Sequence, residues 1–138
     1  MLFRSFALYT PQGRLAAQSY FYVNPEHPNV LVLDNIEANQ GRNTDKILEL
    51  YKEALTQYLL DRFAADSEWN IDTVHVGTGY GDVVKASVLR LPAANTISDN
   101  LGRIYTDAKQ QRLLLRLSDE QIAESRQNRP LEIGRAHV

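Results

Sequence analysis

The 138-residue sequence contains no cysteine, and this absence excludes several kinds of site. Without thiols the chain has no disulfide framework, no thiolate zinc centre and no cysteine nucleophile. It has only three histidines, and one of them, His137, falls in a tail that is treated separately below. Because imidazole and thiolate groups are the usual ligands of transition metals, no metal site is expected.

Positive charge is not in excess either. The chain carries 15 lysines and arginines against 17 aspartates and glutamates, a formal net charge of −2. Neutralising a phosphate backbone needs a basic surface, so nucleic acid is not an expected partner. No apolar run approaches the length of a membrane span, and no basic segment followed by an apolar stretch opens the chain. These absences favour a cytoplasmic protein without a membrane partner.

The last seven residues, 132–138, do not read as part of a fold. Their sequence, Glu-Ile-Gly-Arg-Ala-His-Val, is the in-frame translation of a common short-read sequencing adapter preceded by one guanine. We therefore expect them to be adapter-derived, which removes His137 as a ligand or base. On this interpretation residues 118–131 form a polar helical tail cut short at Leu131, and Met1 need not be the natural start.

The N-terminal third predicts three antiparallel strands. Phe3–Tyr9 and Leu15–Val23 are rich in aromatic and apolar residues, and Pro11-Gln12-Gly13 between them supplies turn chemistry. After a second turn that holds two prolines, residues 30–33 form a continuous apolar run. Such a run is typical of a central strand that is buried on both faces.

A long amphipathic helix follows these strands. Its apolar side chains recur at spacings of three and four, which places them on one helix face. They are Ile47, Leu48, Tyr51, Ala54, Leu55, Tyr58, Leu59 and Phe63. Either Asn43 or Thr44 can cap the helix, Asp45 suits its first turn, and the helix should end near Ala65.

The second half of the chain begins with a strand and a glycine-rich turn. Ile71–Val76 alternates and predicts the strand, and Gly77–Asp82 carries three alternating glycines. Val83–Leu91 predicts a short helix that Pro92 stops.

Two further segments complete the fold. Arg103–Thr106 predicts a strand, whereas Leu113–Leu117 is compatible with either a strand or a helix. Ser118 and Gln121 have the spacing of a capping box, which opens a polar terminal helix. The order β-β-β-α-β-α-β predicts an α/β protein of the mixed-sheet (α+β) type, with helices covering the sheet and a right-handed β-α-β crossover.

This order of elements resembles the C-terminal two-thirds of the GNAT family of acyl-coenzyme A N-acyltransferases. The resemblance covers Phe3 to Leu117, so residues 1–117 would be a partial GNAT-like domain that lacks the N-terminal helices of the family. It implies transfer of an acyl group from acetyl-coenzyme A, or another acyl-coenzyme A, to the amine of a small molecule or protein. The oligomeric state stays open.

One loop supports the resemblance. The family pattern there is glutamine or arginine, two free positions, glycine, one free position, and glycine or alanine, and backbone amides at the helix start hold the pyrophosphate. The corresponding residues are Gln40, Gly41, Arg42, Asn43, Thr44 and Asp45. Gln40 matches, whereas Asn43 replaces the first glycine and Asp45 the small residue. The resemblance assigns cofactor binding to residues 40–44 and to Ile36, in the strand whose backbone would pair with the pantetheine arm.

The resemblance also implies catalytic groups. Glu37, just past the third strand, is the candidate general base that takes a proton from the attacking amine, and Asp34 is its rival. Tyr80 and Tyr105 are candidates for protonating the leaving thiolate. Asparagine tolerates a positive φ, which would make Asn43 a mild departure from glycine. Asp45 is a larger departure from the family pattern, because its carboxylate brings negative charge to an anion site. The positive charge of Arg42 could offset that charge.

Two alternatives stay open. The amides of Gly77–Gly81 either contact the cofactor or acceptor or simply form a tight turn. His75 is expected to be a satisfied structural residue, with Asp72 or Asp82 as a conceivable partner. The departures at Asn43 and Asp45 also fit a degenerate GNAT-like domain that has lost catalysis and acts as a structural or binding module in a larger protein.

Overall fold

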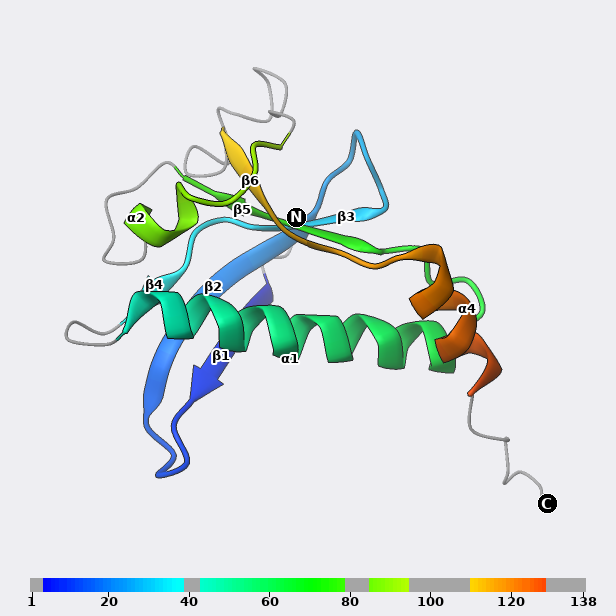
Figure 1. Ribbon diagram of the computed structural model, residues 1–138, viewed down its shortest axis with the longest axis horizontal. Coiled ribbons are helices and arrows are strands. Elements are labelled where there is room, and N and C mark those ends of the chain that lie inside the picture. The colour runs from blue at the N-terminus through cyan, green and yellow to red at the C-terminus, as the bar shows by residue number, and fades with distance from the viewer. Residues whose placement is uncertain (1–3, 39–42, 79–84, 95–109, 129–138) are drawn as a thin grey trace.

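A mixed sheet with one long helix across its face organises the chain (Figure 1). The computed structural model describes residues 4–38, 43–78, 85–94 and 110–128. The elements in chain order are β1 (Arg4–Tyr9), β2 (Leu15–Val23), β3 (Val30–Leu33), β4 (Glu37–Ala38), α1 (Thr44–Ala65), β5 (Thr73–Gly77), α2 (Lys85–Val88), β6 (Gln111–Arg116) and α4 (Asp119–Gln127). Within these residues the sheet has six strands in the order β1-β2-β3-β5-β6, with β4 paired to β2.

The predicted hairpin is confirmed. β1 and β2 are antiparallel from Arg4, which pairs with Phe21, to the end of β1. The turn closes where the Gly13 amide donates to the Thr10 carbonyl at 2.8 Å. Gly13 has a φ of +82°, a left-handed conformation that glycine adopts without a steric penalty.

The predicted β-α-β crossover is also confirmed. β3 pairs antiparallel with β2, and after α1 the chain returns as β5, parallel to β3. All four residues of β3 and all five of β5 are buried, which confirms that the apolar run 30–33 is a central strand. β6 then pairs antiparallel with β5. The segment Leu113–Leu117, which was compatible with a strand or a helix, therefore contributes to a strand.

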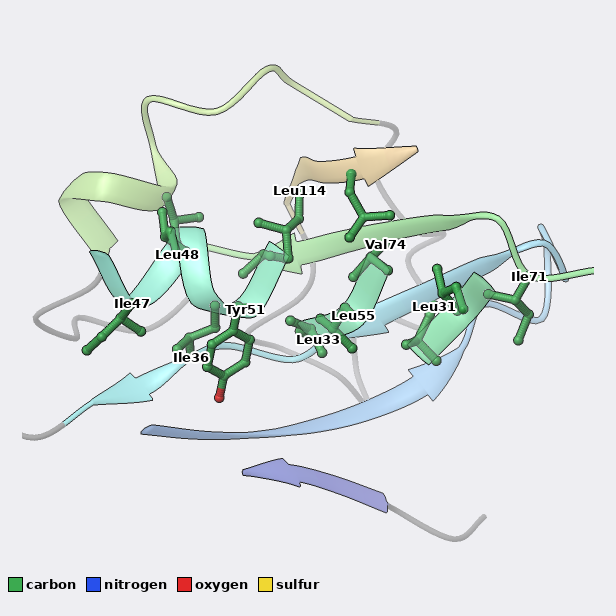
Figure 2. Close-up of a cluster of buried hydrophobic side chains, with 14 of the residues drawn as sticks. Leu31, Leu33, Ile36, Ile47, Leu48, Tyr51, Leu55, Ile71, Val74 and Leu114 are labelled. Carbon is green, nitrogen blue, oxygen red and sulfur yellow. The ribbon is translucent and has the colours of Figure 1, made fainter. Parts of the chain in front are cut away.

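The core lies between α1 and one face of the sheet. Figure 2 shows α1 side chains meeting side chains of β3, β5 and β6. The helix buries Ile47, Leu48, Tyr51, Leu55, Leu59 and Phe63. Six such side chains at about 1.5–3 kcal/mol each outweigh any intrinsic helix propensity, so packing holds α1 in place. The predicted helix and its end at Ala65 are confirmed, and Asn43 rather than Thr44 is the cap. The predicted apolar stripe is confirmed except at Ala54, which is half-buried, and at Tyr58, which is 44 % exposed.

The terminal helix α4 packs against the C-terminal half of α1 (Figure 1). The predicted capping box is present, because the Ser118 hydroxyl accepts from the Gln121 amide and the Gln121 side chain accepts from the Ser118 amide. On the packed side, the Ser125 hydroxyl donates to the Leu60 carbonyl. Arg126 donates to the carbonyls of Ser67 and Trp69, so α4 is tied to the chain that follows α1.

Some predicted boundaries were wrong. The helix expected to run to Leu91 ends at Val88, because the amides of Arg90 and Leu91 donate three residues back, to Ser87 and Val88, and tighten the chain into turns. The strand expected from Ile71 begins at Thr73.

The cause of the late start of β5 lies in the neighbouring loop. The amides of Asp72 and Thr73 both donate to the Asn29 carbonyl, and the regular ladder begins only there. The backbone of about Asp34 to Ala38 was expected to belong to the third strand, whereas Glu37–Ala38 forms a separate strand, β4, that pairs with β2. The expected strand Arg103–Thr106 lies outside the described residues.

Candidate functional site

The edge at which β3 leaves β5 is the centre of the candidate site. Leu33 pairs with Val76, and this is the last pair of the parallel ladder. The chain then makes an irregular step and continues as β4, which pairs with β2. Between Leu33 and Glu37 the chain advances four residues while β2 advances only three, from Phe21 to Gln18. One extra residue therefore bends the strand, as in a β-bulge.

The bend separates two neighbouring strands. β4 is paired with β2 on one side, and among the described residues no ladder joins β4 to β5 on the other. At this bend Ile36 packs near Ile47 and Tyr51, at the start of α1 (Figure 2). The resemblance to the GNAT family assigned the pantetheine arm to the strand backbone here.

The strand residues assigned to the site face opposite sides of the sheet. Ile36 is 2 % exposed and belongs to the core under α1, so only its backbone remains for a ligand. Ala38 also packs against this core. Side chains alternate along a strand, so Glu37 lies on the face opposite α1, where it is exposed.

The start of α1 is capped by Asn43. Its side-chain oxygen accepts from the Lys46 amide at 3.1 Å, and its carbonyl accepts from the Ile47 amide. Asn43 has a φ of −73°, in the extended region. The expectation that asparagine serves here by adopting a positive φ is therefore wrong, because this position needs no left-handed conformation. Its cap occupies one amide that an anion would otherwise find open.

Asp45, in the first turn, is bound sideways to α2. Its carboxylate accepts from the Ser87 hydroxyl at 2.7 Å and from the Arg90 guanidinium. The Thr44 hydroxyl lies 2.7 Å from the same Ser87 oxygen. The Ser87 hydrogen bond above all, and then the charge of Arg90, lower the pKa of Asp45. The carboxylate thus stays ionised, and Arg90, two residues past the end of α2, balances its charge.

The cation that balances Asp45 is not the expected one. Arg42 was the cation expected to offset Asp45, and it lies outside the described residues, as do Gln40 and Gly41. Arg90 fills the role, and no local pattern pointed to it, because it is 45 positions away. The candidate tyrosines Tyr80 and Tyr105 also lie outside the described residues.

A second feature lies on the far face of the sheet. His75, on β5, is 6 % exposed and its Nδ1 lies 2.8 Å from Oε1 of Gln111 on β6. Burial above all lowers the pKa of His75, so the imidazole is neutral at pH 7. The expected partner was Asp72 or Asp82. For Asp72 the structure differs, because its carboxylate accepts from Asn29 and Thr73, while Asp82 lies outside the described residues.

Two negative findings apply to the part of the chain that the structure describes. It contains no group of three or more histidine, aspartate or glutamate side chains arranged to hold a metal ion. None of its helices combines the length and apolar character needed to cross a bilayer.

Comparison of the chain with protein-family models, with curated proteins and with solved structures gave no match.

Proposed function

We propose that this chain is an acyl-coenzyme A-dependent N-acyltransferase that transfers an acetyl or other acyl group to an amine, as its resemblance to the GNAT family implies. The observation that carries the proposal is the bend after Leu33, which parts β4 from β5 directly before the N-terminus of α1. An extended pantetheine arm can pair with the open side of β4. The adjoining amides of α1 then face the pyrophosphate.

The reaction assigns a role to each candidate residue. The amine nitrogen forms a bond to the thioester carbon, the carbon–sulfur bond breaks, and coenzyme A leaves as the thiolate. Glu37 accepts the proton of the attacking amine, and its exposed position on the face opposite α1 gives the acceptor access to it. Tyr80 or Tyr105 returns a proton to the thiolate. Residues 40–44 hold the cofactor phosphates.

Asp45 decides how well such a site can bind. A carboxylate at a helix N-terminus competes with an anion for the same amides. Its pairing with Ser87 and Arg90 turns this charge toward α2 and balances it. We propose that the phosphates bind beside this pair, with the remaining donors of Arg90 facing them.

Thermal unfolding of the full chain with increasing acetyl-coenzyme A tests the proposal. A ligand at 100 times its Kd stabilises the folded state by about 2.7 kcal/mol, so a saturable rise in Tm is expected. Glu37→Gln should keep this rise and lose acyl transfer, because Glu37 acts on the amine and not on the cofactor. Absence of any rise at millimolar acetyl-coenzyme A would reject the enzyme.

The same Asp45 favours a second candidate, a degenerate GNAT-like domain retained as a structural or binding module. In that case the wild-type chain shows no rise in Tm with acetyl-coenzyme A, whereas Asp45→Gly, which frees the helix amides, creates one. A rise in the wild-type chain that Asp45→Gly does not increase would argue against the degenerate domain.

A further inference from the structure

The face of the sheet opposite α1 contains a cavity of about 240 Å³. It lies beside the N-terminal ends of β3 and β5, and the loop before β3 contributes His27 and Asn29 to its lining. Side chains that line it include His27, Asn29, Thr73, His75, Leu113 and Arg116. Val74 and Val76 face the core under α1, so the alternate residues Thr73 and His75 face this cavity. It is separate from the start of α1, where the cofactor phosphates are proposed to bind.

His75 presents a hydrogen-bond acceptor to this cavity. Gln111 Oε1 can only accept, so the proton of the neutral imidazole is on Nδ1. Nε2 therefore carries a lone pair, and among the described residues it has no hydrogen-bond donor. A ligand N–H group is a suitable partner for such a nitrogen.

Arg116 brings an unbalanced positive charge to the same cavity. Within the described residues it takes part in no salt bridge. Two carboxylates are adjacent in sequence to lining residues. Asp72, beside Thr73, is bound by Asn29 at 3.0 Å and by Thr73 at 2.8 Å. Glu26, beside His27, forms no salt bridge with Arg116. A guanidinium without a carboxylate partner favours a ligand that supplies one.

The cavity is a site apart from the proposed reaction centre. Its lining includes Val30 and Thr73, the first residues of β3 and β5, and His75, which pairs with Val32. Glu37 comes five residues after Val32, about 16 Å along a strand. Glu37, the proposed base, lies on this same face of the sheet. The volume of the cavity equals that of about eight water molecules, so the cavity admits a small molecule and not a polypeptide.

From these lining residues we infer that the cavity binds a small amine that also carries a carboxylate, of the amino-acid class. Arg116 binds the carboxylate, and His75 Nε2 accepts a hydrogen bond from the amine nitrogen. The inference follows from the cavity alone and is independent of the proposed function.

Titration of the full chain with glycine, followed by NMR of the imidazole nitrogens, tests the ligand class without acyl-coenzyme A. Glycine should shift the His75 Nε2 resonance saturably, acetate should do so more weakly, and ethylamine should have no effect at the same concentration. Arg116→Gln should weaken glycine binding at least tenfold. Arg14→Gln, an exposed arginine in the β1–β2 turn, is the matched control and should bind as the wild type does.

The outcomes separate the two proposals. Failure of 100 mM glycine to shift the His75 resonance, or equal glycine affinity in Arg116→Gln and the wild type, overturns the ligand class. Glycine binding without acetyl-coenzyme A binding overturns the proposed function and supports the ligand class.

Discussion

Tyr51 carries a hydroxyl group into the apolar layer between α1 and the sheet. The residue is fully buried (Figure 2). Its ring contacts Phe6 edge-on at a centroid distance of 5.1 Å. Burial raises the pKa of Tyr51 to about 12, and the nearby Ser19 hydroxyl acts in the opposite direction. The folded protein therefore holds this proton more tightly than the unfolded chain does.

Alkaline pH should consequently unfold the protein through Tyr51. Between pH 10 and about 12 the unfolded chain loses the proton and the folded state keeps it, so stability falls as pH rises, by about 2 kcal/mol at the upper end. Urea unfolding at pH 8 to 11.5 measures this. Tyr51→Phe should flatten the curve, and Tyr9→Phe, at an exposed position, should not. Equal slopes in both variants would contradict the assignment.

His75 should make the stability of the protein fall in acid, whereas Tyr51 makes it fall in alkali. Its pKa is lowered by burial, with the positive charges of Arg116 and His27 acting in the same direction. The unfolded chain then binds the proton first, so the free energy of unfolding declines as pH falls below 6.5. Denaturation between pH 5 and 7.5 tests this. His75→Asn should reduce the decline, whereas His27→Asn, in an exposed loop, should largely retain it.

At the scale of elements, the start of α1 and helix α2 depend on each other through Asp45. The Ser87 hydrogen bond is the main cause of the lowered pKa of Asp45, ahead of the charge of Arg90. Ser87→Ala and Arg90→Ala should each raise that pKa toward its ordinary value, because Arg90 lowers it by its charge and also by a hydrogen bond. NMR titration of the carboxyl carbon measures both. An unchanged pKa in either variant would contradict the role of that residue.

The capping box of α4 permits a second test at this scale. Ser118→Ala removes the acceptor for the Gln121 amide and should cost about 1 kcal/mol of stability. Ser118→Thr keeps a hydroxyl and should cost much less. Chemical unfolding of the three proteins gives the comparison, and equal losses in both variants would mean that the cap contributes nothing.

Local signals explain which elements were predictable. The stripe of α1, its Asn43 cap and the Ser118 capping box each involve residues within a few positions of one another, so the sequence pattern identifies them. β4 is only two residues long and is defined by its pairing with Ala17 and Gln18, which no local pattern contains. The same reason left β6 ambiguous, because the pairing with β5 decides between strand and helix.

For the whole molecule, the order of elements predicted the sheet better than the site. The antiparallel hairpin and the parallel crossover follow from connection lengths. The partners within the site do not, because His75 meets Gln111 and Asp45 meets Arg90 across 36 and 45 positions. Several polar side chains of the sequence could have been the partner of His75 or of Asp45. Only the packing of the folded sheet determines which of them lies within hydrogen-bond distance.

The attachment of α4 is a property of the whole molecule that can be measured. Arg126 donates to the carbonyls of Ser67 and Trp69 and lies over the Phe63 ring, with 5.1 Å from its guanidinium carbon to the ring centroid. Arg126→Ala should cost about 1.5 kcal/mol, the low end for bonds from a charged donor, and should speed hydrogen exchange in α4. Glu120→Gln, on an exposed turn of the same helix, should leave exchange unchanged. Unaltered exchange in Arg126→Ala would exclude this role.

The parallel pairing of β3 with β5 also sets an order of events in time. Val30 pairs with Thr73, 43 positions later, so β3 cannot complete its hydrogen bonds until all of α1 and β5 have been synthesised. The β1–β2 hairpin needs no such delay, since its strands are neighbours in the chain. During translation, the β1–β2–β3 segment therefore exposes an apolar strand edge that other chains can join. The recombinant yield should depend on how quickly α1 docks onto the sheet. Expression at a lower growth temperature should therefore favour the native protein over aggregates.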